Sequence, residues 1–73
     1  MHPLEEKRKK NKLTMDAMGE KLGCGLSVYK SWIYGWRYPS AKNLQRIEEE
    51  VGVTPGELWE AYKARRPAPE AAE

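Results

Sequence analysis

Basic side chains gather in the first two-thirds of the 73-residue chain. Residues 1–46 carry ten Lys and Arg against four Asp and Glu, and residues 47–73 carry three against seven, so the two parts have net charges of +6 and −4. The run KRKKNK from Lys7 to Lys12 is the densest part of the basic portion. Clustered cations of this kind bind polyanions such as nucleic acids. The pattern favours one face that binds a polyanion, and scattered charge on a solvated surface is the alternative.

Residues for other kinds of chemistry are few. The chain has one histidine, His2, and one cysteine, Cys24, which together offer neither a zinc site nor an internal disulfide. It has no nucleophile–base pair, carboxylate pair or phosphate-binding glycine loop. No apolar run approaches the length of a membrane span. We therefore expect no enzyme, no metal ion, no cofactor and no membrane partner.

Helix-start and helix-stop residues divide the chain into short helical segments. The pattern predicts helices over residues 4–10, 15–22, 26–34, 41–51 and 55–64. Residues that cap helix N-termini precede three of them: Thr14, Ser40 and the capping box Thr54-Pro55-Gly56-Glu57. Nothing in the sequence is typical of a strand pair. We predict a compact, all-α, five-helix domain over residues 1–64, followed by a loose tail over residues 65–73.

The segment 15–34 has the spacing of two helices that meet closely across a tight turn. Gly19 is the small residue that a close approach needs on the first helix, although glycine is unfavourable inside a helix. Gly23 suits a turn with positive φ. Tyr29 and Trp32, three residues apart, are typical of core anchors on the second helix. This order of residues is a helix-turn-helix signature.

The chain resembles the Cro/CI-type (XRE-like) helix-turn-helix family of DNA-binding regulators, whose fold is lambda-repressor-like. The resemblance covers roughly residues 4–62. The matching positions are Leu4, Arg8, Leu13, Thr14, Gly19, Leu22, Gly23, Tyr29, Trp32, Gly35, Arg37, Tyr38, Pro39, Ser40, Leu44, Ile47, Val51, Gly52, Val53, Thr54 and Leu58.

The resemblance implies that helix 26–34 is a recognition helix in the major groove of double-stranded DNA. The base-contacting residues that it implies are Leu26, Ser27, Lys30 and Ser31. The phosphate-contacting residues that it implies are Thr14, Tyr34, Trp36, Arg37 and Tyr38. We expect the basic run that ends at Lys12 to add further phosphate contacts. A cluster under the last helix is the alternative environment for the rings of Trp36 and Tyr38.

The family also implies a function. It is that of a sequence-preferring transcriptional regulator, a Cro-like repressor that binds an inverted-repeat operator as a homodimer and needs no small-molecule ligand. Its location would be the cytoplasm of a prokaryotic cell or of a phage-infected host. The alternative is a protein–protein module on the same scaffold, such as an antitoxin or anti-repressor. Its face would include Trp59 and Tyr62, which otherwise close the core or form a dimer patch.

The sequence departs from the family pattern at three positions. Ile33 stands where the family commonly has a glutamate that pairs with the arginine matching Arg8, so we expect Arg8 to point to solvent or DNA. Gly25 stands where a serine or threonine usually caps the recognition helix, and we expect it to act as a weaker cap. Gly19 often corresponds to an alanine, which we expect to be a mild difference.

Overall fold

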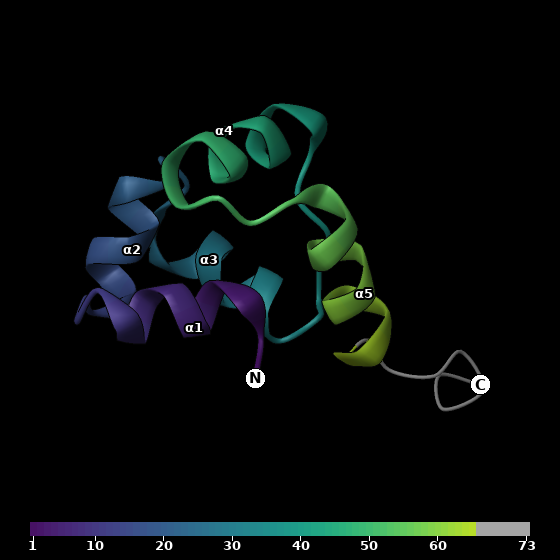
Figure 1. The fold of residues 1–73 in the computed structure, drawn as a ribbon, viewed down its shortest axis with the longest axis horizontal. Helices are drawn as coiled ribbons and strands as arrows, with labels where there is room; N and C mark the ends of the chain where they lie inside the picture. The colour runs from purple at the N-terminus through teal and green to yellow at the C-terminus, as the bar shows by residue number, and fades with distance from the viewer. Residues whose placement is uncertain (66–73) are drawn as a thin grey trace.

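A computed structural model describes residues 1–65, and this part of the chain contains five α-helices and no strand (Figure 1). The helices are α1 (Pro3–Lys10), α2 (Met15–Lys21), α3 (Gly25–Ile33), α4 (Ala41–Val51) and α5 (Pro55–Arg65). The predicted all-α, five-helix fold is confirmed. The observed bounds lie within about one residue of the predicted ones.

The predicted caps account for where three helices begin. The Thr14 hydroxyl oxygen accepts a hydrogen bond of 3.0 Å from the Ala17 N–H. The Ser40 hydroxyl oxygen accepts one of 3.4 Å from the Asn43 N–H. In the capping box, Glu57 accepts from the Thr54 N–H at 2.9 Å and Thr54 accepts from the Glu57 N–H at 3.2 Å. These side chains satisfy N–H groups that have no partner inside the helix.

The beginning of α3 differs from the expectation. Gly25 is the first residue of this helix, Cys24 precedes it, and no side chain caps the helix start. Gly25 has a φ of +84°, which glycine adopts more easily than any other residue. The prediction that Gly25 acts as the cap is therefore wrong by one position, and the residue instead allows the turn to enter α3.

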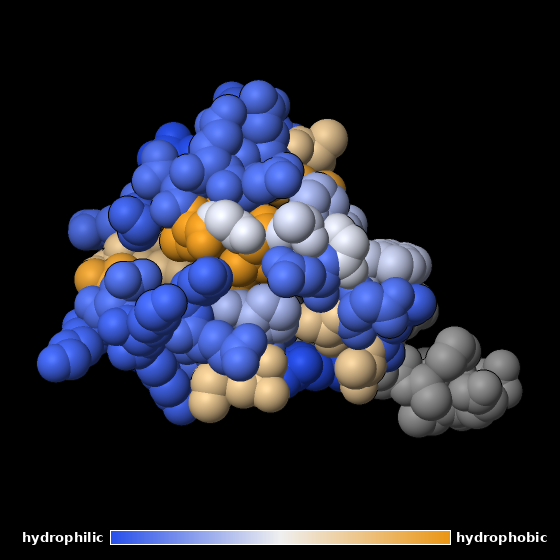
Figure 2. All heavy atoms as spheres, in the orientation of Figure 1, coloured by the Kyte–Doolittle hydropathy of each residue, from blue (hydrophilic) through white to orange (hydrophobic). Residues whose placement is uncertain are grey.

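The core lies where the five helices converge on α3, near the centre of Figure 1. Its buried side chains are Leu4, Met18, Leu22, Tyr29, Trp32, Ile33, Ile47, Val53 and Leu58. The aromatic anchors of the helix-turn-helix signature are therefore packed inside. In Figure 2, hydrophilic side chains cover α1 and α4, and a strip of hydrophobic atoms shows between them.

The last described helix, α5, extends to the end of the described residues. Arg65, where we predict the tail to begin, is the last residue of α5. The rest of the predicted tail, residues 66–73, lies outside the described residues. Within residues 1–65, no helix is long and apolar enough to cross a membrane.

Candidate nucleic-acid interface

The helix pair α2–α3 approaches so closely that backbone meets backbone. A Cβ atom added at Gly19 would lie 2.7 Å from both the carbonyl carbon and the carbonyl oxygen of Gly25, and 3.1 Å from the Leu26 nitrogen. Backbone atoms cannot turn aside as a flexible side chain can. The expectation that alanine would be a mild difference at position 19 is therefore wrong, and only glycine fits this approach without a shift of one helix.

The turn between α2 and α3 is held from outside by α4. Gly23, in the turn, has a φ of +73°. The guanidinium of Arg46 lies above it, since a Cβ atom at Gly23 would be 3.6 Å from the Arg46 Cζ. The same guanidinium donates a hydrogen bond of 3.2 Å to the Lys21 carbonyl at the end of α2. A cation at this end also favours the helix dipole. Arg46 was not singled out in the sequence because its partner is 25 residues away.

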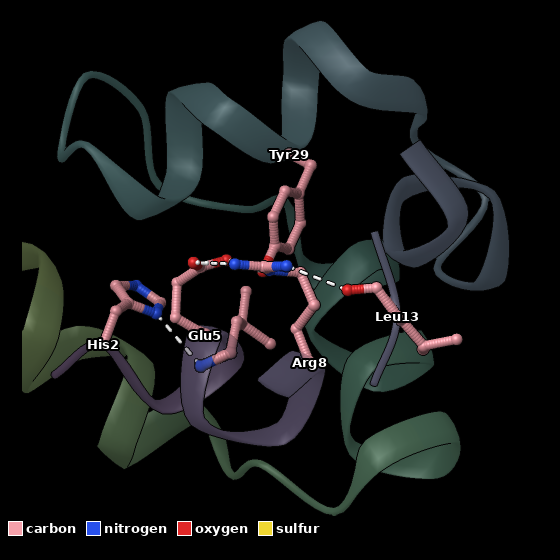
Figure 3. A network of polar contacts seen from close by, with 6 residues as sticks. His2, Glu5, Arg8, Leu13 and Tyr29 are labelled. Atoms are coloured by element: carbon pink, nitrogen blue, oxygen red, sulfur yellow. Dashed lines mark hydrogen bonds and ion pairs between the residues drawn. The ribbon is translucent and has the colours of Figure 1, made fainter. Parts of the chain in front are cut away.

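A polar network ties α1 to the inner side of α3 (Figure 3). Arg8 donates two hydrogen bonds of 2.8 Å to the Glu5 carboxylate, one to each oxygen, and a third of 2.8 Å to the Leu13 carbonyl. The Tyr29 hydroxyl donates to the same carboxylate at 2.6 Å. The expectation that Arg8 points to solvent or DNA is therefore wrong. Glu5, one turn earlier on the same helix, supplies the carboxylate that Ile33 cannot.

The network is electrostatically consistent. The hydrogen bonds from Arg8 lower the pKa of Glu5, and burial together with the Glu5 carboxylate raises the pKa of Tyr29. Near neutral pH the carboxylate is therefore ionised and the tyrosine is neutral. Among residues 1–65, no buried polar side-chain atom is without a hydrogen-bond partner. On the inner side of α3, within the described chain, no buried polar side-chain atom is therefore left to bind a ligand.

The outer side of α3 carries a short polar stripe. Ser27 and Tyr34 are exposed and Lys30 is partly exposed, and the three follow one another at i, i+3 and i+7. Leu26 is partly buried beside them. The fourth predicted base-contacting residue, Ser31, is not on this stripe. Its side chain is buried, and its hydroxyl donates to the Val28 carbonyl at 2.6 Å.

The chain turns back over Ser31, which explains this burial. The N–H groups of Trp36 and Arg37 both donate to the Ser31 carbonyl, at 2.9 and 3.1 Å. Gly35, with a φ of +79°, makes the reversal possible. The turn therefore covers Ser31 and brings residues 36 and 37 beside the last turn of α3.

Three cationic side chains among the predicted contact residues are not used by the fold. Within residues 1–65, no carboxylate lies within salt-bridge distance of the predicted contact residues Lys12, Lys30 and Arg37. Their side chains make no hydrogen bond in the same part of the chain. Lys12, in the turn before α2, also has a φ of +57°, an unusual value for a residue with a side chain. These cations remain available to an external anion.

The two loop aromatics that follow α3 have different surroundings. The Trp36 ring lies 5.3 Å from the Tyr34 ring, centroid to centroid, and its side chain is 67% exposed. The Tyr38 ring instead packs on Trp59 and Tyr62 of α5, and its hydroxyl donates to the Pro55 carbonyl at 3.2 Å. Tyr38 therefore belongs to an aromatic cluster with α5, and Trp36 does not.

The remaining predicted contact residue lies at the start of α2. Thr14 is exposed, and its hydroxyl oxygen already accepts from the Ala17 N–H. A phosphate at this point would meet the remaining N–H groups of the first turn.

Among residues 1–65, no group of His, Cys, Asp or Glu side chains is arranged to hold a metal ion.

The close approach of α2 and α3 across a tight turn is the geometry of a helix-turn-helix motif. A family model described as helix-turn-helix, of the XRE-family type, matches residues 4–58. The chain belongs to this family, which confirms the resemblance drawn from the sequence. Searches of curated proteins and of solved structures gave no match.

Proposed function

We propose that residues 1–64 act as a sequence-preferring regulator of transcription, a Cro-like repressor that reads the major groove of double-stranded DNA with α3. The observation that carries this proposal is the division of α3 into two sides. Its inner side is locked by packing and by the bond from Tyr29 to Glu5, and its outer side presents Ser27 and an unpaired Lys30. A recognition helix needs this combination of a fixed position and free donors.

The base contacts follow from the chemistry of the outer stripe. The Lys30 ammonium donates to guanine O6 and N7, and the Ser27 hydroxyl donates to or accepts from several base edges. The half-buried side chain of Leu26 suits a thymine methyl group. Ser31 is left out of the proposed contacts because its hydroxyl is already bonded inside the domain.

The proposed phosphate contacts come from the turn after α3 and from the start of α2. Arg37 and Lys12 supply unpaired cations, and the N-terminus of α2 at Thr14 supplies backbone N–H groups. Tyr34 and Trp36 lie next to Arg37, at the end of α3. Tyr38 is left out, because its hydroxyl bonds Pro55 and its ring packs on α5.

A homodimer is the expected binding form. One recognition helix reads only a few base pairs, so specificity requires two copies on half-sites about one helical turn apart in an inverted repeat. Repression then follows from occupancy, since a dimer on the operator excludes other proteins from the same groove. The protein would do this in the cytoplasm of a prokaryotic cell or of a phage-infected host.

Selection of binding sites from a random duplex library tests the proposal, followed by a salt titration on the enriched site. We expect an inverted repeat with half-sites about 10 bp apart and an affinity that falls steeply with salt. A library without enrichment, together with weak binding that salt abolishes, would contradict groove reading by α3.

Two single variants separate the proposed roles. Lys30→Ala should change the selected base at one position of each half-site, at a loss of about 1–3 kcal/mol on the original site. Arg37→Ala should weaken binding to all duplexes about equally and lower the salt slope by about one. Lys63→Ala on α5 is the control and should leave DNA affinity unchanged. Equal effects of all three variants would contradict the assignment of α3.

A second candidate function is a protein–protein module of the antitoxin or anti-repressor kind. Trp59 favours it, because this side chain remains 43% exposed on α5 although it stacks on Tyr62. Five glutamates on α4 and α5, Glu48, Glu49, Glu50, Glu57 and Glu60, contribute to the negative charge of residues 47–73. An unenriched library would direct attention to this surface.

A further inference from the structure

Two neighbouring aromatic side chains are exposed at the end of the recognition helix. Tyr34 is 45% exposed and Trp36 is 67% exposed, and their rings are 5.3 Å apart with an angle of 48° between the planes. In residues 1–65, Tyr34 is the only aromatic side chain in ring contact with Trp36. Most of the Trp36 ring is therefore free to stack on an incoming planar group.

The backbone beneath Trp36 is well fixed. Its N–H donates to the Ser31 carbonyl at 2.9 Å, the Arg37 N–H donates to the same carbonyl at 3.1 Å, and the Gly35 N–H donates to the Trp32 carbonyl at 3.3 Å. The indole therefore projects from a turn whose backbone is already ordered. The backbone at this position loses little conformational freedom when the ring binds a ligand.

Cations stand on both sides of this aromatic pair along the chain. Lys30 precedes Tyr34 by one helical turn, and Arg37 directly follows Trp36. Neither side chain has an ion-pair partner within residues 1–65. A free aromatic face between cations is the combination that binds single-stranded nucleic acid, because bases stack on the ring and phosphates pair with the cations. A closed duplex offers no free base face to such a ring.

We propose that Trp36, supported by Tyr34, is a stacking site for an unpaired DNA base, so that the domain prefers duplex next to single strand over duplex alone. The inference rests on the proposed function, because α3 must hold the adjoining duplex while the base reaches Trp36. It adds a ligand class, the unpaired nucleobase, to the groove contacts.

Three DNA probes of one duplex sequence test the proposal: a blunt duplex, a duplex with a short thymidine tail, and a duplex whose tail has the same phosphates but abasic sugars. Each is titrated against the wild-type chain, Trp36→Leu and Trp59→Leu. Trp36→Leu removes the ring and keeps an apolar group. Trp59→Leu is the matched control, since it removes another exposed indole, on α5. Thermal melting of each variant checks that it is folded.

We expect the wild-type chain to bind the thymidine-tailed duplex about tenfold more tightly than the abasic-tailed duplex, from stacking of one base. Trp36→Leu should lose this gain, so that it binds the thymidine-tailed and abasic-tailed duplexes equally, and Trp59→Leu should retain the gain. Equal wild-type affinity for the two tailed duplexes, or a gain that survives in Trp36→Leu, overturns the inference and leaves groove binding intact. A wild-type chain that binds none of the three probes overturns both proposals.

Discussion

The two sides of α3 involve similar residue types in opposite states. Those of the inner side are hydrogen-bonded to one another, and those of the outer side are not. On the inner side, Tyr29 and the charged pair Glu5–Arg8 are bonded to one another, and Arg8 also reaches the Leu13 carbonyl. On the outer side, Tyr34 and Lys30 are left without such partners within the described chain. Polar groups that satisfy one another add stability and cannot bind a ligand, whereas unpaired cations add little stability and are free for phosphate or bases.

The two sides of α3 should therefore respond differently to substitution. Changes on the inner side should lower the free energy of unfolding and affect DNA only through the fold. Changes on the outer side should alter DNA affinity and leave unfolding nearly unchanged.

Gly19→Ala should have the largest effect on the inner side. The new Cβ atom would lie 2.7 Å from the backbone of Gly25, so α2 and α3 must move apart. We expect a loss of about 3 kcal/mol in the free energy of unfolding, measured by urea denaturation. Gly56→Ala is the control, because a Cβ atom there would meet only the Thr54 hydroxyl oxygen, at 3.9 Å. A Gly19→Ala protein as stable as the control would contradict the close approach.

Acid should destabilise the domain through His2, which precedes α1. This side chain is buried, its Nδ1 accepts from the Leu4 N–H, and burial lowers its pKa from 6.5 to about 4. Between these values the unfolded chain binds more protons than the folded chain, so the free energy of unfolding falls as the pH falls. We expect a loss of about 2 kcal/mol between pH 7 and pH 5.

His2→Asn provides the control for this pH effect, because asparagine also caps a helix and does not titrate. Its free energy of unfolding should be nearly constant over the same range. Glu5 contributes little to this pH dependence. Its pKa is lowered from the ordinary value of 4.5, so its contribution to the free energy of unfolding is lost mainly below that pH. A variant with the same pH dependence as the wild-type chain would show that another group is responsible.

Tyr29→Phe should have an intermediate effect. It keeps the buried ring and removes the 2.6 Å bond from the hydroxyl to the Glu5 carboxylate. We expect a loss of about 1.5 kcal/mol in the free energy of unfolding, which is typical of a hydrogen bond to a charged group. Tyr34→Phe, which removes an exposed hydroxyl, should change unfolding by less than about 0.5 kcal/mol. Equal effects of the two substitutions would remove the distinction between the two sides.

Lys12→Gly should have the smallest effect, of opposite sign. Lys12 has a φ of +57°, and glycine adopts this conformation without strain. We expect a gain of up to about 1 kcal/mol in the free energy of unfolding, together with weaker DNA binding from the lost cation. Lys10→Gly, at the end of α1, is the control and should lower stability. A loss of stability in Lys12→Gly would contradict the strained backbone at this position.

Much of the fold could be predicted because its signals are local. Thr14, Ser40 and the box at Thr54 and Glu57 act within three residues, and each caps the helix it was expected to cap. The helical spacing also identified Tyr29 and Trp32 as buried. Such signals need no knowledge of the rest of the structure.

The features that the sequence did not reveal depend on distant parts of the chain or on the path of the backbone. Arg46 reaches a carbonyl 25 residues away, and Ser31 is buried because the following turn folds back over it. Glu5 gave a signal that could have been used, since it lies three residues before Arg8 on one helix face. The need for glycine at position 19 follows from the helix separation, which no local pattern gives.

Amide chemical shifts of the uniformly labelled chain, followed during a titration with the selected duplex, show which residues the DNA contacts. On the proposed docking, DNA binds the outer side of α3 and the turn after it. We predict the largest shifts at Ser27, Lys30, Tyr34 and Arg37, with small shifts for α5. The largest shifts at Trp59 and its neighbours on α5, with α3 unchanged, would contradict it.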